Sequence, residues 1–322
     1  MNKRKCFKVL SRTAWLIFHF SGLRFIWQKI SPPGGHSIYE KPPSTFVLWL
    51  VSAYVAFFGI ASIRYENRID KIENRAHSIY TQLSTPAYKK ALSRIPRVQN
   101  MQCPYNPTIL DPLSVFRSLF SKECKYFEIV GLLKETVEDW KDSLDSVILE
   151  GVNLQEAHLD EANFQEAILD GANLQRAWLF GANFQEAHLA RANLQRAWLI
   201  KANLQGAFVA KANLQGAELL GANLQGADFW QANLQRAWLK KANLQEAMFL
   251  KANLQGADFD GANLQEAMFM KADLQGARNL PIEQLCKVKT LYGAKLDAEL
   301  EKQMRKDYPH LFQTSKEREM GK

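Results

Sequence analysis

Small and large apolar residues recur among polar ones at a fixed interval of five over the middle of the chain. An alanine stands at every fifth position from Ala157 to Ala277, and two residues after nearly every alanine comes Leu or Phe. The repeat reads Ala-Asn-Leu-Gln-x, and its central residues run from Leu149 to Leu274, which makes 26 tandem repeats. A fixed period over this length predicts a solenoid.

Neither a helix nor a plain strand keeps a side chain in one direction every five residues. We therefore expect each repeat to be a short extended run plus a corner that holds the small Ala, with four corners closing a square coil. Ala and the central Leu or Phe point inward, and stacked coils about 4.8 Å apart pair their backbone amides as in a parallel sheet. Rings twenty residues apart should then stack inside the rod, Phe229, Phe249 and Phe269 on one side and Phe164 and Phe184 on another.

Constant and variable repeats alternate, so two opposite faces of the square carry Asn and Gln ladders and the other two vary. The variable faces carry the candidate interaction surface. Its residues are Trp178, Phe180, Trp198, Ile200, Leu220 and Trp238 on one face, and Phe208, Trp230, Met248, Leu250, Met268 and Met270 on the other. Contiguous apolar patches of this kind are rare on soluble monomers. The cover is the chain's own N-terminal helices or a second copy, a partner protein, or lipid.

Both ends of the rod need a cap, because an open β-helix exposes strand edges and its apolar axis. Residues 124–144 place Val130, Leu133, Val137 and Trp140 at helical spacing, which predicts an amphipathic helix against the first coil.

At the other end, Pro281 predicts the start of a helix over 281–290. Asp297 is expected to cap a second helix, which ends before Pro309. Between them, residues 294–297 repeat the pentapeptide pattern once more and are expected to close the last coil.

Nineteen residues without a charge, from Thr45 to Ile63, precede the repeats. As a helix they would span about 28 Å against about 30 Å of hydrocarbon, so they predict a single transmembrane helix rather than a buried core helix. Upstream, the apolar stretch Trp15–Trp27 is interrupted by polar and charged residues, and we interpret it as an interfacial helix rather than a second span. A Pro/Gly linker follows from Pro32 to Pro43.

The orientation of the predicted span is not set by charge. Lys and Arg number eight in residues 1–44 and eight in residues 64–97, so the positive-inside rule chooses no side. The four cysteines lie far apart and suggest neither a disulfide framework nor a metal site, which favours a reducing compartment. We expect the rod on the cytoplasmic side.

Residues 65–83 follow the predicted span with a coiled-coil spacing. The apolar positions are Tyr65, Ile69, Ile72, Ala76, Ile79 and Leu83. This seam predicts a homo-oligomer, and the alternative is a helix packed on the rest of a stalk.

The tandem Ala-Asn-Leu-Gln repeats over 147–277 resemble those of the pentapeptide-repeat proteins, whose fold is a right-handed quadrilateral β-helix. That family includes DNA mimics that protect topoisomerases, and many members, especially cyanobacterial ones, have no assigned activity. A membrane segment followed by Arg-Tyr-Glu-Asn-Arg-Ile-Asp and later by the repeats looks like the second group. The resemblance therefore implies the fold and no particular activity.

Charge and residue types exclude several functions. Residues 149–276 carry fourteen acidic and ten basic residues, and the stretch 187–256 carries eight basic and three acidic ones, which is not the dense acidic surface of a duplex mimic. The chain's overall charge of +8 comes largely from residues before the span, so we expect no nucleic-acid partner. Scattered histidines and the lack of a phosphate loop predict no enzyme, cofactor or metal. Asp258 and Asp260 are interpreted as solvated carboxylates beside Lys240.

The sequence thus predicts a β fold, a right-handed quadrilateral β-helix with helical caps, behind an α-helical membrane and stalk region. The predicted segments are 1–44, 45–63, 64–146, 147–277 and 278–322. Our functional hypothesis is a single-pass, membrane-anchored, non-catalytic scaffold that binds lipid through its N-terminus and a partner protein through the rod. The alternative is an accessory subunit or regulator of a membrane transport complex.

Overall fold

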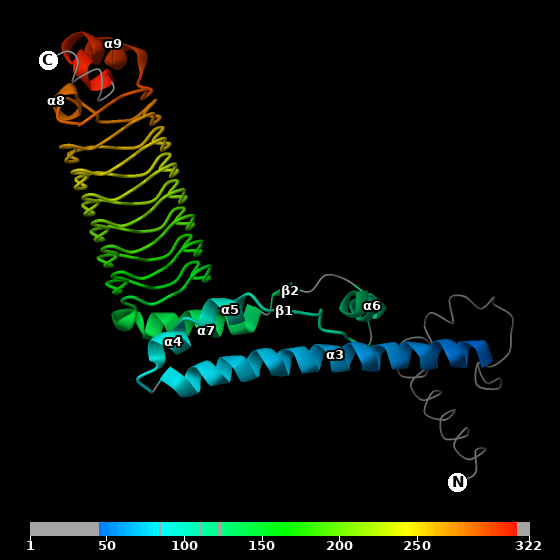
Figure 1. The fold of residues 1–322 in the computed structure, drawn as a ribbon. Helices are drawn as coiled ribbons and strands as arrows, with labels where there is room; N and C mark the ends of the chain where they lie inside the picture. The colour runs from blue at the N-terminus through cyan, green and yellow to red at the C-terminus, as the bar shows by residue number, and fades with distance from the viewer. Residues whose placement is uncertain (1–44, 84, 110, 121–123, 126, 314–322) are drawn as a thin grey trace. The chain divides into compact units, whose positions relative to one another are not determined.

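The computed structural model places the repeats in a four-sided β-helix with helices at both ends (Figure 1). It describes residues 45–83, 85–109, 111–120, 124–125 and 127–313. The chain divides into two compact units, the first made of residues 1–74 and 101–126 and the second of residues 75–100 and 127–322. The interfacial helix and the linker predicted before residue 45 lie outside the described residues.

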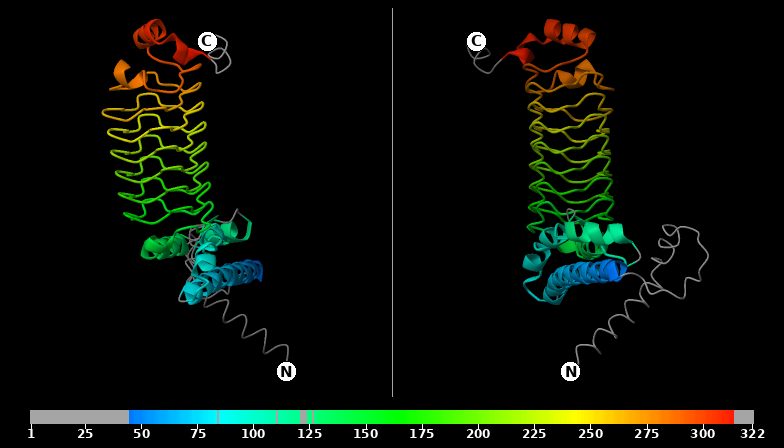
Figure 2. Two further views of the ribbon diagram at one scale, coloured as in Figure 1. Left: turned by 60° about the vertical axis from the view of Figure 1, so that its left-hand side comes forward. Right: turned by 90° about the vertical axis from the view of Figure 1, so that its right-hand side faces the viewer.

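Residues twenty apart pair as parallel bridges, four times in each coil, which confirms the four-sided rod (Figure 2). Neighbouring amides point in opposite directions along the rod. The Asn203 N–H donates to the Ala182 carbonyl in one adjacent coil, at 2.9 Å, and the Leu204 N–H donates to the Asn223 carbonyl in the other, at 2.7 Å. Each coil is therefore hydrogen-bonded on both sides, and the backbone of the interior is satisfied without a flat sheet.

The interior of the rod is filled by the two inward positions of each repeat. Ala222 and Leu224, for example, are fully buried. The predicted phenylalanine stacks are confirmed: ring centroids are 5.0 Å apart for both Phe229–Phe249 and Phe249–Phe269, and 4.9 Å apart for Phe164–Phe184.

Each corner is a β-turn whose third residue is the fifth residue of the repeat. In one turn the Ala207 N–H donates to the Leu204 carbonyl at 3.0 Å, and Gly206 between them has φ +66°. A positive φ at this position defines a type II turn. The same left-handed conformation occurs at every fifth residue from Ser146 to Gly276, whether it is Gly, Glu, Lys, Arg, Gln or Ser. The sequence analysis assigned the corner to Ala; in the structure Ala follows the corner and is buried beneath it.

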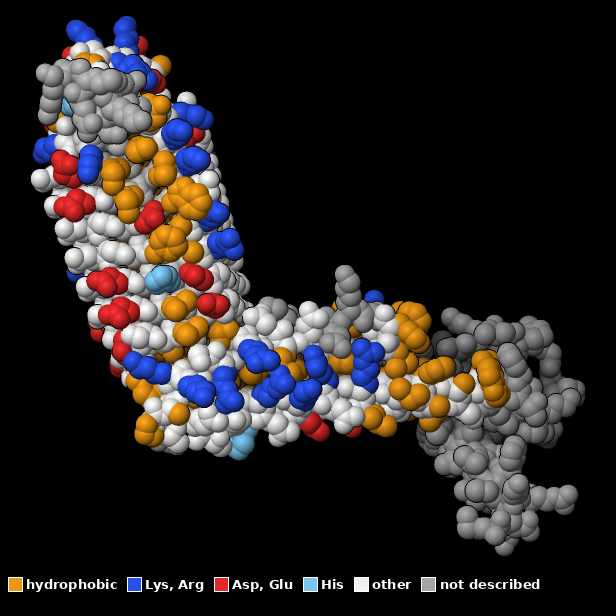
Figure 3. All heavy atoms as spheres, viewed as in Figure 1, with side chains coloured by type: hydrophobic (Ala, Val, Ile, Leu, Met, Phe, Trp, Pro, Cys, Tyr) orange, Lys and Arg blue, Asp and Glu red, His pale blue; other side chains and the backbone are white. Residues whose placement is uncertain are grey.

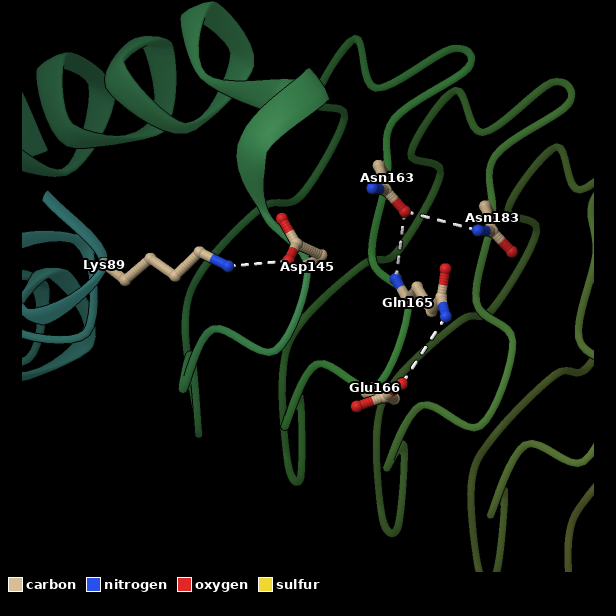
Figure 4. Close-up of polar contacts among 6 residues, drawn as sticks. All are labelled: Lys89, Asp145, Asn163, Gln165, Glu166 and Asn183. Atoms are coloured by element: carbon tan, nitrogen blue, oxygen red, sulfur yellow. Dashed lines mark hydrogen bonds and ion pairs between the residues drawn. The ribbon is translucent and has the colours of Figure 1, made fainter.

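The constant faces carry the predicted amide ladders. The Asn183 Nδ2 donates to Asn163 Oδ1 at 3.2 Å, and the same oxygen accepts the Gln165 backbone N–H at 3.3 Å (Figure 4). On the opposite constant face, Gln195 Nε2 donates to Gln215 Oε1 at 3.0 Å. Asn is suited to this position because one side chain both closes its own turn and bonds to the next coil.

The first coil is capped by α7 (Phe127–Asp139) and η1 (Lys141–Ser143), as predicted. Leu133 and Val137 of α7 are fully buried, and the Glu138 carboxylate accepts the backbone N–H of His158 at 2.7 Å. The Lys141 carbonyl accepts the Asn163 N–H at 2.8 Å. These acceptors bind amides that have no preceding coil to bond to.

The last coil is capped by α8 (Ile282–Leu285), α9 (Ala298–Asp307) and η2 (Pro309–Phe312). The first of these helices is shorter than the predicted 281–290, with Pro281 as its N-cap. Asp297 is the N-cap of α9, but its carboxylate accepts the N–H of Gly276 at 2.9 Å instead of an N–H of that helix. The bridge between Asp273 and Lys295 confirms that residues 294–297 close the last coil.

Most of the predicted coiled-coil seam, which lies on α3 (Thr45–Leu83), is buried. The second unit contains the end of this helix together with α4 (Tyr88–Leu92) and α5 (Ile95–Gln99). Ala76, Ile79 and Leu83 are buried, and the Tyr80 hydroxyl beside them accepts a hydrogen bond from Thr136 of α7 at 2.8 Å. The structure therefore does not support a coiled coil here, because these apolar side chains already pack inside their own chain. Lys89 of α4 pairs with Asp145 at 2.6 Å, which joins this layer to the first coil (Figure 4).

In the first unit, the earlier part of α3 contacts a two-stranded antiparallel sheet and a short helix. The strands are β1 (Gln102–Cys103) and β2 (Cys124–Lys125), and the helix is α6 (Pro112–Phe120). Arg68 Nε donates to the Gln102 carbonyl at 2.7 Å, and Arg64 donates to the Leu119 carbonyl at 2.8 Å.

The predicted transmembrane helix over 45–63 is not supported. Among the residues that the structure describes, no helix has an apolar stretch long enough to cross a membrane. The 39-residue α3 becomes charged from Arg64 onward, and the side chains of residues 45–48 lie outside the described part.

Candidate interaction surface

One variable face of the rod, which we call the tryptophan face, carries a column of exposed indoles. Its outward residues come directly before and directly after the buried central residues of the repeats on this face, such as Leu179, Leu199 and Leu239. The ring centroids of Trp178 and Trp198 are 4.3 Å apart. Both rings stay exposed, as does Trp238, which is half exposed. The predicted tryptophans are therefore placed together on the outside.

A groove of about 660 Å³ runs along this column. Its lining combines indoles with charged side chains from the adjacent corner. The residues are Glu156, His158, Arg176, Trp178, Arg196, Trp198, Gly216, Glu218 and Trp238. The groove is therefore an elongated surface rather than an enclosed ligand pocket of the kind that small molecules occupy.

Glu218 interrupts the indole column. Its backbone pairs with Trp198 on one side and with Trp238 on the other, so the two indoles lie two coils apart with a carboxylate between them. Within the described residues, the Glu218 side chain has neither an ion pair nor a hydrogen bond, although it is half buried. Gly216, at the corner of the same coil, also lines the groove and has no side chain that could cover Glu218.

Both edges of the middle of the tryptophan face are basic. One corner column contributes Arg176, Arg196 and Arg236, and the other contributes Lys201 and Lys241, all exposed. Arg176 pairs with Glu156 at 3.4 Å.

The remaining predicted residues of this face lie on its second outward column. Phe180 and Leu220 are exposed and Ile200 is half buried. Lys201 lies over the Phe180 ring, 5.6 Å from its centroid, a cation–π distance. The second column thus widens the apolar strip beside the indoles.

The opposite variable face, which we call the methionine face, holds the other six predicted residues. Phe208 is exposed, whereas Trp230, Met248, Leu250, Met268 and Met270 are half buried. Lys211 lies 4.6 Å from the Trp230 ring centroid and shields part of it. The two faces are on opposite sides of the rod, so the structure divides the predicted residues into two separate surfaces.

Asp258 differs from the solvated carboxylate that the sequence predicted. It is 5% exposed, accepts a hydrogen bond from Asn279 at 2.8 Å and lies 3.7 Å from Lys240 and 3.8 Å from Arg278. Burial acts to raise the pKa of this carboxyl, but the hydrogen bonds from Asn279 and Asp260 and the two cations outweigh it and lower the pKa. Its contacts tie the last full coil to the C-terminal cap. In the described part of the chain, no cluster of His, Cys, Asp or Glu is arranged to hold a metal.

Comparison with known proteins agrees with this architecture. The family model for pentapeptide repeats matches in eight copies, within residues 148–240 and 249–278. HetL, a pentapeptide repeat protein involved in heterocyst differentiation regulation from the cyanobacterium Nostoc sp. strain PCC 7120, is 32% identical. That match covers 47% of this chain and 77% of HetL, with a TM-score of 0.27.

A second pentapeptide repeat protein from Nostoc PCC 7120 is 31% identical over 34% of this chain and 84% of its own, with a TM-score of 0.28. One from the Arabidopsis thaliana thylakoid lumen is 28% identical over 33% and 76%, with a TM-score of 0.15. No curated protein sequence matches the chain. The repeats and the HetL match show that the chain belongs to the pentapeptide-repeat family.

Proposed function

We propose that the protein is a non-catalytic scaffold whose tryptophan face binds a partner protein. The observation that carries this proposal is the column of stacked, exposed indoles in an open groove on a rigid rod. Aromatic side chains offer large contact areas at low entropic cost, and they are enriched in protein–protein interfaces. The interior of the rod is complete without these indoles, so their exposure is not required for folding.

The charges around the groove favour a protein over the other occupants. Lipid contact would place Arg196 and Glu218 against hydrocarbon, which is costly. A phosphate backbone would meet the Glu218 carboxylate at the centre of the groove. A second copy on this face would bring basic edge against basic edge. A protein strip with apolar side chains, an acidic rim and a central basic side chain for Glu218 matches the groove.

The test replaces Trp178, Trp198 and Trp238 together with Ser in the whole chain. Proteins captured by wild type from its native lysate are quantified by mass spectrometry against the triple variant. A matched control replaces Gln175, Gln195 and Gln235 with Ser, because these residues also point outward and have the same spacing, twenty and forty residues, as the three tryptophans. We expect a specific protein to be lost from the tryptophan variant and retained by the glutamine control.

Circular dichroism of both variants distinguishes a lost interface from a lost fold. If the tryptophan variant keeps its β-helix and still captures every wild-type partner, the proposed function is wrong. Raised salt should also weaken capture by wild type, since the rim contacts are ionic and exposed.

Membrane attachment and the location of the rod stay predictions. What supports attachment is the exposed apolar side chains of the first unit, Trp49, Phe57 and Ile60 on α3 and Phe116 and Phe120 on α6. Flotation with vesicles of neutral phospholipid tests it: wild type should float, and a variant with Ser at Phe116 and Phe120 should float less. The alternative of a transport-complex subunit, with contacts made through the segment 45–63, also stays a prediction.

A further inference from the structure

Charged side chains at two corners of the rod form columns along the two edges of the methionine face. Both columns consist of fifth residues of repeats, and all of their members are exposed. The acidic column is Glu166, Glu186, Glu246 and Glu266, and the basic column is Arg191, Lys211, Lys251 and Lys271. Figure 3 shows this face, with the acidic column along one edge, the basic column along the other and apolar side chains between them.

The two columns do not neutralise each other within one copy. Glu186 and Arg191 lie at opposite edges of the same coil, as do Glu246 with Lys251 and Glu266 with Lys271. Across the described residues, no ion pair connects the two columns. The face therefore presents unpaired charge of opposite sign on its two sides.

The surface between the columns is apolar and uneven. The outward position before each central residue holds Ile168, His188, Phe208, Met248 and Met268, and the outward position after it holds Ala190, Ala210, Trp230, Leu250 and Met270. The two carboxylates between the columns are already bonded to the backbone: Asp170 accepts the Ala190 N–H and Asp228 the Trp230 N–H, both at 2.9 Å. Between the columns, a partner that covers this face thus meets these two bonded carboxylates and the exposed His188 as polar side chains.

We propose that the methionine face binds the methionine face of a second copy of this chain, with the two rods parallel. A two-fold axis along the rod exchanges left and right edges but keeps the height of every coil. The acidic column of each copy then lies against the basic column of the other. A two-fold axis across the rod would instead make the rods antiparallel and bring acidic column against acidic column, which like-charge repulsion opposes.

Parallel rods also bring complementary residues together at each height. Glu186 faces Arg191 of the partner, Glu246 faces its Lys251 and Glu266 faces its Lys271, and the symmetry doubles each pair. Between the columns, the position before the centre faces the position after it. Phe208 therefore packs against the small Ala210 of the partner, and Met248 against its Leu250.

The interface is modest in size. The face is roughly 30 Å tall and, with its corner side chains, roughly 16 Å wide, from strand and coil spacings. This gives roughly 500 Å² for each copy, near the lower end of specific interfaces. We therefore expect a reversible dimer with a strong dependence on salt.

The first test reverses the basic column with the substitutions R191E, K251E and K271E in the whole chain. Apart from Lys211, whose opposite corner in the same coil is Gly206, both edges of the face are then acidic. The dimer dissociation constant measured by sedimentation should therefore rise at least tenfold. The matched control carries R176E, R196E and R236E, on the column beside the tryptophan face. It makes the same change in charge at corners with the same backbone conformation, φ between 54° and 59° in all six, and should stay within about threefold of wild type.

The second test examines the direction and register of the rods. The single variants K271E and E266K each place like charges opposite one another and should dimerise weakly. Mixed together, they restore both ion pairs at that height, so a heterodimer should form with an affinity close to that of wild type. In antiparallel rods these residues lie at opposite ends, and mixing would restore nothing.

Three results would overturn the proposal. One is a wild-type chain that stays monomeric at about 100 μM in low salt. Another is equal weakening by the basic-column variant and its control while both keep their β-helix by circular dichroism. The third is failure of the mixed single variants to form a heterodimer. These results measure self-association, whereas the proposed function is measured by capture of a partner protein, so the two are tested separately.

Discussion

The rings of Phe229 and Phe249 lie on successive coils with their centroids 5.0 Å apart and their planes 7° from parallel. This distance is close to the spacing of paired strands, about 4.8 Å, so the backbone ladder and the ring stack share one repeat along the rod. The stack continues to Phe269 at the same distance. One ring therefore packs against a ring on either side, which makes the central position sensitive to changes in volume.

We expect Phe249→Ala to lower the free energy of unfolding by about 3–5 kcal/mol, because it leaves a cavity between two fixed rings. Phe249→Leu should cost less than about 2 kcal/mol, since Leu fills the same inward position in most other repeats. Urea unfolding followed by circular dichroism measures both. Equal costs for the two substitutions would show that volume at this position does not control stability.

The inward alanines should not accept a larger side chain. Ala222 is fully buried beneath a corner, so Ala222→Leu should overpack the coil and cost about 1–3 kcal/mol. Ala190→Leu is the matched control, because Ala190 is an outward residue on the methionine face and is only half buried. Thermal melts should show a lower midpoint for the first variant and little change for the second. An unchanged midpoint for Ala222→Leu would contradict the inward packing.

Corner residues should prefer glycine for conformational reasons alone. Gly221 has φ +65°, and a Cβ there would meet only Lys201 Cγ at 3.9 Å, an ordinary contact. Gly221→Ala should therefore cost about 1 kcal/mol from the left-handed conformation rather than from a clash. The converse change Lys241→Gly, at φ +54°, should raise the melting midpoint slightly. Opposite signs for the two variants support the turn type, and equal signs contradict it.

Asp258 should make the C-terminal end of the rod sensitive to acid. Its pKa is lowered in the folded state, so its stabilising contribution is present above its unfolded pKa, about 3.9, and is lost as the pH falls through the folded value. Wild type should be more stable than Asp258→Asn at pH 7, and the difference should shrink as the pH falls below about 4. Unfolding midpoints between pH 2 and 7 measure this. The same series on Asp260→Asn, an exposed neighbour, should show a smaller difference.

The inward core of the rod could be predicted residue by residue from the chain. A period of five, with a small and a large apolar residue two positions apart, allows one arrangement that buries both residues. The four sides of the rod, the phenylalanine stacks and the amide ladders can then be assigned by counting residues along the chain. The helical caps could also be placed, since apolar spacing in 124–144 and the residues Pro281 and Asp297 act locally. The lengths of the capping helices could not be predicted as well, as the short α8 shows, because helix ends depend on tertiary contacts.

Other features depend on contacts between residues that lie far apart in the sequence. The seam of Ala76, Ile79 and Leu83 has the same spacing whether it meets a second copy or its own chain, and only the packed structure shows these side chains buried. Asp258 looked solvated because its partners Asn279 and Arg278 come from the segment after the repeats. The left-handed corners were missed because Glu, Lys and Arg together occupy them more often than Gly does.

The period by itself determined which residues lie inside the rod, since apolar burial allows one arrangement of side chains at that interval. Tertiary structure decided which edge each corner charge borders. The fifth residue of each repeat lies at a corner shared by two faces. Because its side chain is not part of the core, apolar burial does not determine which face it borders. The indole groove, in which Glu218 lies one coil from Trp198 and one coil from Trp238, therefore became visible only once the coils were stacked. The same holds for the acidic and basic edges of the methionine face.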